Sequence, residues 1–345
     1  MEESALHALL KKGQQYAASD ILLKVGQPPA FRVAGSLHYL QGDKLKPDQT
    51  KALARFVLAN SRYQGTLDDL QQWDTAYSVP GVGRYRVNAY RQRGTLALAL
   101  RSIPVRIPTF EELHIPPMVS QLAELDRGMI LVCGAAGNGK SSTLAAMIGH
   151  VNAVRRSHVV TIEDPIEFIH SDGSSLISQR EVGLDTESFA AALRSALRQS
   201  PDVILVGEIR DAETMDIGLK AAETGHLFMS TLHTPDVTRT VGRILSLMGD
   251  RDGREVRERL ADNLKAIIAQ RLLPSVDGGM ALACEILVVT GTARETIRKP
   301  EGNLPFKDIM ERGVHPYGMQ TFEMHLRELV KAGRVEVDVA RQALG

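Results

Sequence analysis

The sequence predicts an α/β protein of two domains, and three observations indicate this class. After about residue 118, short apolar segments of strand type alternate with segments of helical periodicity. A smaller set of helices and alternating strands precedes them, and a proline-rich segment separates the two regions. We therefore expect a smaller domain over residues 1–103, a linker over 104–117 and a larger domain over 118–345, with a helical C-terminal region from about 290.

In the smaller domain we expect two amphipathic helices and four strands. One helix lies at the N-terminus and one near residues 49–59, and their apolar faces are formed by Leu6, Leu9 and Leu10 and by Leu53, Phe56 and Val57. The strands are expected over residues 20–25, 30–33, 83–90 and 95–103. The linker that follows contains four prolines, which cannot continue a helix or a central strand: Pro104, Pro108, Pro116 and Pro117.

The larger domain has the alternation of a mainly parallel sheet flanked by helices. Its strands are expected over residues 129–133, 158–162, 202–206, 226–231 and 281–289. One helix is expected within residues 186–198. The tail is expected to be helical, because apolar residues recur there at helical spacing: Phe322, Leu326, Leu329 and Val330.

The segment Gly134–Ser141 matches the complete pattern G-x-x-x-x-G-K-[ST], between an apolar strand and an amphipathic helix. Glycines let the backbone N–H groups wrap a triphosphate at close range. Lys140 can then neutralise the β and γ oxygens, and Ser141 can ligate Mg²⁺. The sequence therefore predicts ATP and Mg²⁺ as cofactors, with nucleotide-binding residues Gly134, Ala135, Ala136, Gly137, Asn138, Gly139, Lys140, Ser141 and Ser142.

Composition argues against several other classes of protein. Lys and Arg total 41 and Asp and Glu total 41, so the formal net charge is +0 and the usual electrostatic case for a nucleic-acid binder is missing. The two cysteines, Cys133 and Cys284, lie in apolar runs without a C-x-x-C partner, which favours buried thiols over a disulfide or a zinc site. Free thiols and the lack of an apolar stretch near 18 residues favour a cytoplasmic protein.

Three further segments resemble motifs of the type II secretion and type IV pilus ATPases. Residues 161–167 resemble that family's aspartate box, residues 203–211 its Walker B motif and residues 224–234 its histidine box. Segments of the smaller domain resemble the family's N-terminal domain, and residues 293–298 partly resemble a C-terminal stretch associated with pilus retraction. The resemblance implies a PAS-like N-terminal α/β domain followed by a RecA-like P-loop ATPase domain with a helical C-terminal tail.

Two acids follow apolar strands, as catalysis beside a phosphate loop requires. A carboxylate at a strand end can hold Mg²⁺ or orient the attacking water. We interpret Glu163 as the general base and Glu208 as a ligand of the metal and of the water network. One sequence does not fix which of the two acids has which role.

The resemblance also implies roles for histidines and arginines. His226 and His233 are implied to sense the γ-phosphate, although a histidine at a strand end is more often a structural hydrogen-bonding group. Arg86 and Arg101 match the family's arginines that stabilise the leaving phosphoryl group, often across a subunit boundary. The sequence leaves open Arg84, Arg91 and Arg93 in that role, as well as a merely solvated strand face.

The function implied by the resemblance is that of an ATP-hydrolysing ring motor, a hexamer, that powers type IV pilus retraction and twitching motility. Its implied partners are an inner-membrane platform protein and a paralogous retraction ATPase, at the cytoplasmic face of the inner membrane. Alternatives are an accessory retraction ATPase and an assembly or secretion ATPase, although the latter carry a four-cysteine zinc module and this chain has only two cysteines. More distant alternatives are a nucleic-acid motor and a non-catalytic nucleotide-binding regulator.

Overall fold

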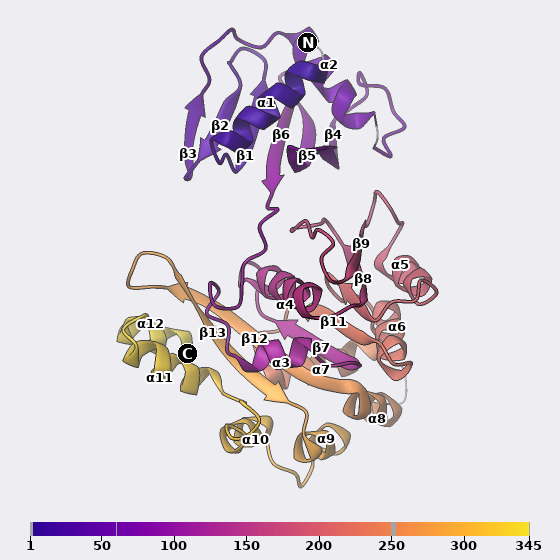
Figure 1. Cartoon of the computed structure of the whole chain (residues 1–345), viewed down its shortest axis with the longest axis vertical. Coiled ribbons are helices and arrows are strands. Elements are labelled where there is room, and N and C mark those ends of the chain that lie inside the picture. Colours follow the sequence, from indigo (N-terminus) through magenta and orange to yellow (C-terminus); the bar gives the residue numbers. More distant parts are fainter. Residues whose placement is uncertain (1–2, 60, 250–252, 345) are drawn as a thin grey trace. The chain divides into compact units, whose positions relative to one another are not determined.

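The computed structural model describes residues 3–59, 61–249 and 253–344, which form two compact units (Figure 1). The first unit runs to Arg106 and also contains two later segments, Pro165–Ile169 and Glu181–Glu187. The second unit contains Ile107–Asp164, His170–Arg180 and the chain from Ser188 onward. Within the described part of the chain, no helix is both long enough and apolar enough to cross a membrane.

The first unit is a six-stranded sheet covered by two helices, α1 (Glu3–Gln15) and α2 (Pro47–Leu58). The strand order is β3-β2-β1-β6-β5-β4, and neighbouring strands pair antiparallel. The strands are β1 (Asp20–Lys24), β2 (Ala30–Val33), β3 (Ser36–Tyr39), β4 (Gln72–Val79), β5 (Gly83–Gln92) and β6 (Thr95–Ile103). The two helices and four of these strands confirm the predicted elements, whereas β3 and β4 were not predicted.

Alternation along β5 explains why both helices pack against the sheet. Tyr85, Val87 and Ala89 are buried while Arg86, between them, is exposed. The buried side chains share one apolar core with residues from both helices, such as Leu10 and others of the same type: Leu6, Leu53 and Val57. Burial of these side chains is what holds the helices to the sheet.

The second unit is built on a seven-stranded sheet in the order β13-β12-β7-β11-β10-β8-β9. The pairs β12–β7, β7–β11, β11–β10 and β10–β8 are parallel, and only the pair β12–β13 is antiparallel among the pairs whose register the structure describes. The strands are β7 (Gly128–Cys133), β8 (His158–Glu163), β9 (Leu176–Glu181), β10 (Val203–Val206), β11 (Leu227–Leu232), β12 (Leu264–Pro274) and β13 (Met280–Val288). The predicted mainly parallel sheet is confirmed, but β9 and β12 were not predicted.

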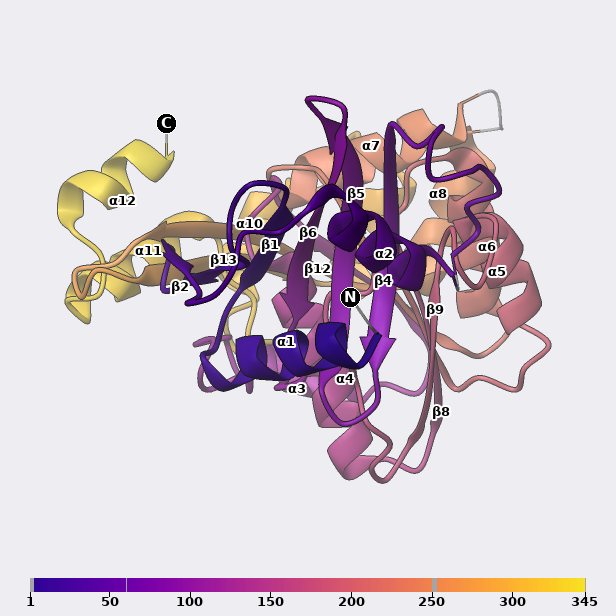
Figure 2. The same cartoon turned by 90° about the horizontal axis from the view of Figure 1, so that it is seen from above.

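Ten helices of the described residues flank this sheet or extend from it. They are α3 (Met118–Ala123), α4 (Lys140–Val154), α5 (Phe189–Ala196), α6 (Ala212–Glu223), α7 (Val237–Met248), α8 (Gly253–Asn263), α9 (Gly291–Arg298), α10 (Phe306–Arg312), α11 (Phe322–Lys331) and α12 (Val337–Leu344). Figures 1 and 2 show α11 and α12 beside the β12–β13 hairpin, and α5 and α6 toward the opposite edge of the sheet. Residues 104–117 contain neither helix nor strand, as the four prolines predicted.

The tail covers the outer edge of β13, which would otherwise present unpaired backbone groups. Gln320 exchanges backbone hydrogen bonds with Ile286, and its side-chain amide donates to the carbonyl of Cys284 at 3.0 Å. The Cys284 N–H donates to Nδ1 of His325, in α11, at 2.9 Å. A buried histidine in the neutral form therefore completes the hydrogen bonding of this strand edge.

His325 predicts that the protein loses stability in mild acid. Burial lowers the pKa of His325 below its ordinary value of 6.5. The unfolded chain therefore takes up the proton first, so the free energy of unfolding is fully retained above about pH 6.5 and falls as the pH drops below that value. The free energy of unfolding can be measured by urea denaturation at about pH 8 and about pH 5.5. It should fall less between these two pH values in His325→Gln than in the wild type, because an amide oxygen accepts the bond from the Cys284 N–H without titrating.

The matched control for this measurement is His38→Gln, since His38 is exposed on β3. It should keep the wild-type pH dependence. An identical loss of stability in His325→Gln and the wild type would show that His325 does not carry the effect.

Candidate nucleotide-binding and catalytic site

The predicted phosphate loop connects β7 to α4. At Gly134 the backbone has φ of 146°, and a Cβ there would lie 2.6 Å from the carbonyl oxygen of Gln270, so a side chain does not fit. Gly139 precedes α4 in the left-handed conformation, with φ of 76°. The loop is thus curled tightly at the N-terminus of a helix, the geometry that binds phosphate groups.

Lys140 is the first residue of α4, and its ammonium group lies inside the curled loop. Nζ donates to the carbonyl oxygens of Gly134 and Ala135, both at 2.9 Å. The residue is only 8% exposed. A buried cation in this position can neutralise the charge of a nucleotide's terminal phosphates.

Strand β12 supports the loop from the side. The Asn138 side-chain oxygen accepts from the N–H of Leu272 at 3.2 Å, and the Gln270 amide donates to the hydroxyl of Thr143 at 2.6 Å. The sequence analysis missed these contacts because β12 itself was not predicted. A polar glutamine within an apolar run was the available signal, since a buried amide requires partners.

The two predicted acids lie at the same edge of the sheet as the phosphate loop. Ile162 of β8 pairs with Val206 of β10 in parallel register, so Glu163 and Glu208 follow adjacent strands. Leu232 of β11 pairs with Cys133 of β7, which immediately precedes the loop. Carboxyl ends of parallel strands meet at one edge, where open α/β sheets bind their ligands.

The carboxylate of Glu208 contacts an arginine and a histidine side chain. His233, which follows β11, contacts its carboxylate through Nε2 at 2.9 Å, and Arg210 forms an ion pair with it. Arg210 also lies 3.6 Å from Asp164. Burial raises the pKa of Glu208, but the hydrogen bonds from Arg210 and His233 outweigh this effect, so the pKa lies below the usual range. Arg210 lies within residues 203–211, the segment that resembles a Walker B motif, but the sequence did not predict it as a site residue.

Hydroxyl groups of β11 fix the backbone around Glu208. Ser230 donates to the carbonyl of Val206 at 2.7 Å, and Thr231 donates to the carbonyl of Gly207 at 2.7 Å. Both residues are at least 95% buried. The signal in the sequence was a pair of hydroxyl residues inside an otherwise apolar strand, which indicates local side-chain bonds to backbone.

Glu163 ends β8, and two side chains donate to the same carboxylate oxygen. The Thr161 hydroxyl lies 2.6 Å from Oε1, and Nε2 of Gln179 lies 3.1 Å from it. Gln179 belongs to β9, a strand that the sequence did not predict. The carboxylate therefore has a defined orientation at the edge of the sheet.

His226 does not lie at this edge. It immediately precedes β11, whose first residue, Leu227, pairs with Gly128 at the start of β7. Its Nδ1 is 2.9 Å from the carbonyl oxygen of Ala221. The interpretation of His226 as a γ-phosphate sensor is therefore not supported within one subunit, because the residue lies at the opposite end of the strand from the phosphate loop and ties a helix end to the sheet.

The predicted arginine pair belongs to the first unit. Arg86 and Arg101 are directly opposite each other on β5 and β6, and both are exposed. Arg101 donates to Asp20 at 2.9 Å, and Arg32 lies 3.7 Å from the same carboxylate. Two like charges in register repel each other, so this pair is suited to an anionic ligand or partner.

The other arginines of the strand have different partners. Arg84 pairs with Glu181 at 2.8 Å, and Glu181 is only 4% exposed. Arg91 donates to several backbone carbonyls, among them those of Leu67 and Leu70. Both guanidinium groups thus bind partners within the first unit. This favours Arg86 and Arg101 over Arg84 and Arg91 as the arginines that contact a phosphoryl group.

A magnesium ion fits the residues at the loop. Among the described residues, no cluster of three His, Cys, Asp or Glu side chains is arranged to hold a metal by itself. Phosphate loops need no such cluster, because the ion takes a hydroxyl, a carboxylate and phosphate oxygens as ligands. Ser141, in the first turn of α4, and Glu208 offer a hydroxyl and a carboxylate of these types.

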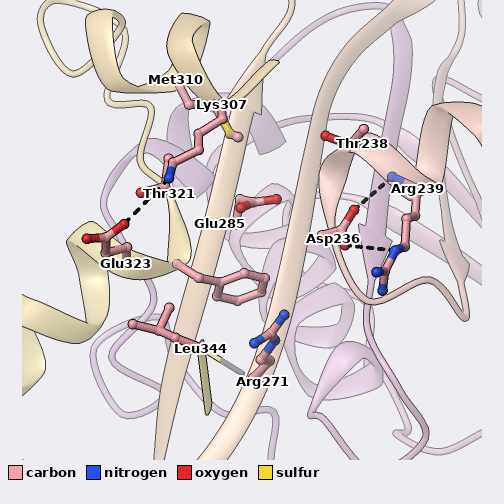
Figure 3. Close-up of a pocket in the computed structure, with 11 residues that line it drawn as sticks. Asp236, Thr238, Arg239, Arg271, Glu285, Lys307, Met310, Thr321, Glu323 and Leu344 are labelled. Atoms are coloured by element: carbon pink, nitrogen blue, oxygen red, sulfur yellow. Dashed lines mark hydrogen bonds and ion pairs between the residues drawn. The ribbon is translucent and has the colours of Figure 1, made fainter. Parts of the chain in front are cut away.

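A cavity of about 560 Å³ lies elsewhere in the second unit, between the β12–β13 hairpin and the tail helices (Figure 3). The guanidinium carbon of Arg271 lies 4.2 Å from the centre of the Phe322 ring, and Arg271 also donates to the carbonyl of Ala343. Asp236 with Arg239, and Lys307 with Glu323, form ion pairs at its rim. No predicted site residue lines this cavity, and its contacts dock the tail on the sheet.

Replacing Lys140 tests the site directly. Lys140→Ala should fold normally, because the bonds that the ammonium group donates to the Gly134 and Ala135 carbonyls lie within the loop itself. It should reduce ATP turnover at least about a hundredfold, since charge neutralisation at the phosphates is lost. Steady-state phosphate release and circular dichroism would check both statements, and substantial residual turnover would refute the assignment of the loop.

Comparison with known proteins places the chain in a family. The model of the family "Type II/IV secretion system protein" matches residues 111–343. The type IV pilus retraction ATPase PilT of Pseudomonas aeruginosa is 39% identical over 97% of this chain and 96% of its own length. The type IV pilus ATPase PilU of the same organism is 40% identical over 98% of this chain and 87% of its own length.

A solved structure agrees with these sequence relationships. The crystal structure of the pilus retraction motor PilT with bound ADP superposes with a TM-score of 0.87, at 41% identity, and covers 97% of this chain and 95% of that one. The predicted family and the two-domain α/β fold class are thereby confirmed. The chain belongs to the type II/IV secretion system family, as its motifs indicated, and is an ATPase of that family.

Proposed function

We propose that this protein is an ATP-hydrolysing ring motor that retracts type IV pili and so powers twitching motility. One observation carries the proposal: an intact phosphate loop and two carboxylates meet at one sheet edge, in a chain similar to PilT over nearly its whole length. A regulator that only binds nucleotide does not require Lys140, Glu163 and Glu208 together.

Nucleotide binding rests on the loop residues Gly134–Ser142. The loop amides and Lys140 hold the phosphates of ATP, and the PilT structure with bound ADP supports nucleotide binding at the matching fold. Ser141 and Glu208 would hold Mg²⁺, which when bound neutralises charge on the β- and γ-phosphates.

Glu163 and Glu208 have different roles in the proposed hydrolysis. Glu208 is a weak base, because its partners Arg210 and His233 stabilise the charged form and lower its pKa. Glu163 is therefore the general base for the attacking water. His233 contacts Glu208 directly and so is placed to transmit loss of the γ-phosphate.

We propose that the subunits assemble as a ring, which the exposed arginine pair and the division into two units support. In our proposal the PAS-like domain of residues 1–103 presents Arg86 and Arg101 to the nucleotide of a neighbouring subunit in a homo-hexamer. Residues 104–117 form the hinge on which nucleotide-driven movement depends. In our proposal the motor acts at the cytoplasmic face of the inner membrane on a platform protein, and the similarity to PilT supports this.

An accessory role beside a second retraction ATPase is the alternative that an observation favours. PilU is 40% identical to this chain and PilT is 39% identical, so identity alone does not separate the two roles. The two roles differ in what loss of the protein does to the cell.

Deleting the gene in its own host separates the roles. A retraction motor should leave cells with excess surface pili and no twitching, since pili are built but not withdrawn. Electron microscopy of pili and a surface-motility assay would measure this. Absent pili would instead indicate an assembly ATPase, and normal pili with weakened motility an accessory one.

Arg101 tests the role of the arginine pair. Arg101→Ala should reduce turnover about tenfold or more while nucleotide affinity changes little, because the arginine acts on charge that develops in the transition state. Mixing Arg101→Ala with Glu163→Ala subunits should restore part of the activity if the arginine acts in trans. Phosphate release from mixed and unmixed rings would show this.

The matched control is Arg32→Ala, because Arg32 contacts the same Asp20 carboxylate from the neighbouring strand. It should retain wild-type turnover. Mixed rings that remain inactive would refute action in trans.

A further inference from the structure

The amide of Gln179 lies beside the proposed general base, and neither the motifs nor the comparisons assign it a role. We propose that Gln179 is a positioning residue that, with Thr161, holds the Glu163 carboxylate in its reactive orientation and in its charged form. The inference rests on the proposed role of Glu163 as general base. It adds strand β9, at the edge of the sheet, to the catalytic machinery.

The orientation of the Gln179 amide is fixed by a backbone group. Its Oε1 accepts from the N–H of His170 at 2.8 Å. A backbone N–H can only donate, so the oxygen of the amide must face His170 and the NH₂ group must face Glu163. The contact of 3.1 Å between Nε2 and Glu163 Oε1 is therefore a donated hydrogen bond, not an arbitrary choice of amide flip.

Both donors act on one oxygen of the carboxylate. The Thr161 hydroxyl reaches Oε1 at 2.6 Å and Gln179 reaches the same atom at 3.1 Å. Two bonds from different directions restrict rotation of the carboxylate plane. They also favour the anion, since hydrogen bonds donated to a carboxylate stabilise its charge. Thr161 is only 1% exposed, so its bond is formed in a poorly hydrated environment.

A simpler interpretation is that Gln179 only ties β9 to the rest of the sheet. The neighbouring residue provides a test of that interpretation. The Ser178 hydroxyl lies 3.0 Å from Nε2 of His158, at the start of β8, and so also joins the two strands. Ser178 has no bond to Glu163 among the contacts described, which makes Ser178→Ala the matched control for a loss of strand pairing.

The experiment measures ATP turnover against pH. Gln179→Met keeps the length of the side chain but removes the donor to Glu163 and the acceptor for the His170 N–H. We expect kcat to fall about tenfold with KM changed less than about twofold, the loss of one hydrogen bond to a charged group. We also expect the acidic limb of the kcat profile to move up by about one pH unit, because the Glu163 anion is less stabilised. Ser178→Ala should change neither the limb nor kcat.

The pair Thr161→Val and Thr161→Ser tests the same oxygen independently. Valine should reproduce the shift of the acidic limb, and serine, which keeps the hydroxyl, should restore the wild-type profile. These variants keep the proposal testable if Gln179→Met does not fold, as judged by circular dichroism and size-exclusion chromatography.

Two kinds of failure are distinguishable. Glu163→Gln with near-normal turnover would refute the assignment of the general base, and with it the basis of the inference. An inactive Glu163→Gln combined with a Gln179→Met enzyme of wild-type kcat and pH profile would refute only the positioning role. Equal losses in Gln179→Met and Ser178→Ala, without a shifted limb, would show that Gln179 merely joins the strands.

Discussion

Parallel pairing of β7, β11, β10 and β8 is the constraint on which the site depends. Because the four strands run in one direction, their carboxyl ends meet at one edge of the sheet. The phosphate loop and His233 directly follow β7 and β11, Glu208 lies two residues after β10, and Glu163 is the last residue of β8. A shift of one strand by one residue would turn its side chains to the other face and separate these groups.

The two acids show how partners give similar side chains different chemistry. Glu208 is bonded to Arg210 and His233, whose charge or hydrogen bonding lowers its pKa and suits it to hold a cation. Glu163 accepts hydrogen bonds from a hydroxyl and an amide. A guanidinium stabilises a carboxylate more than a neutral donor does, so the charged partner of Glu208 supports the proposed division into metal ligand and general base.

The sequence predicted the elements that carry strong local patterns, and it missed those that depend on tertiary contacts. The phosphate loop and the acids at strand ends were found because motif and flanking periodicity agree. Strand β9 has five partly or fully exposed positions and no alternation, so no period identifies it, and Gln179 was missed with it. Likewise His226 and His233 look equivalent in sequence, and only the strand register separates the two ends of β11.

Strand β9 begins in the second unit and ends in the first unit. Two residues after Gln179, Glu181 belongs to the first unit, where it pairs with Arg84 at 2.8 Å and its N–H donates to Asp185. A buried ion pair resists separation, since breaking it leaves a charge without its partner. The strand that orients the proposed general base is therefore anchored, through three consecutive residues, to the unit that carries Arg86 and Arg101.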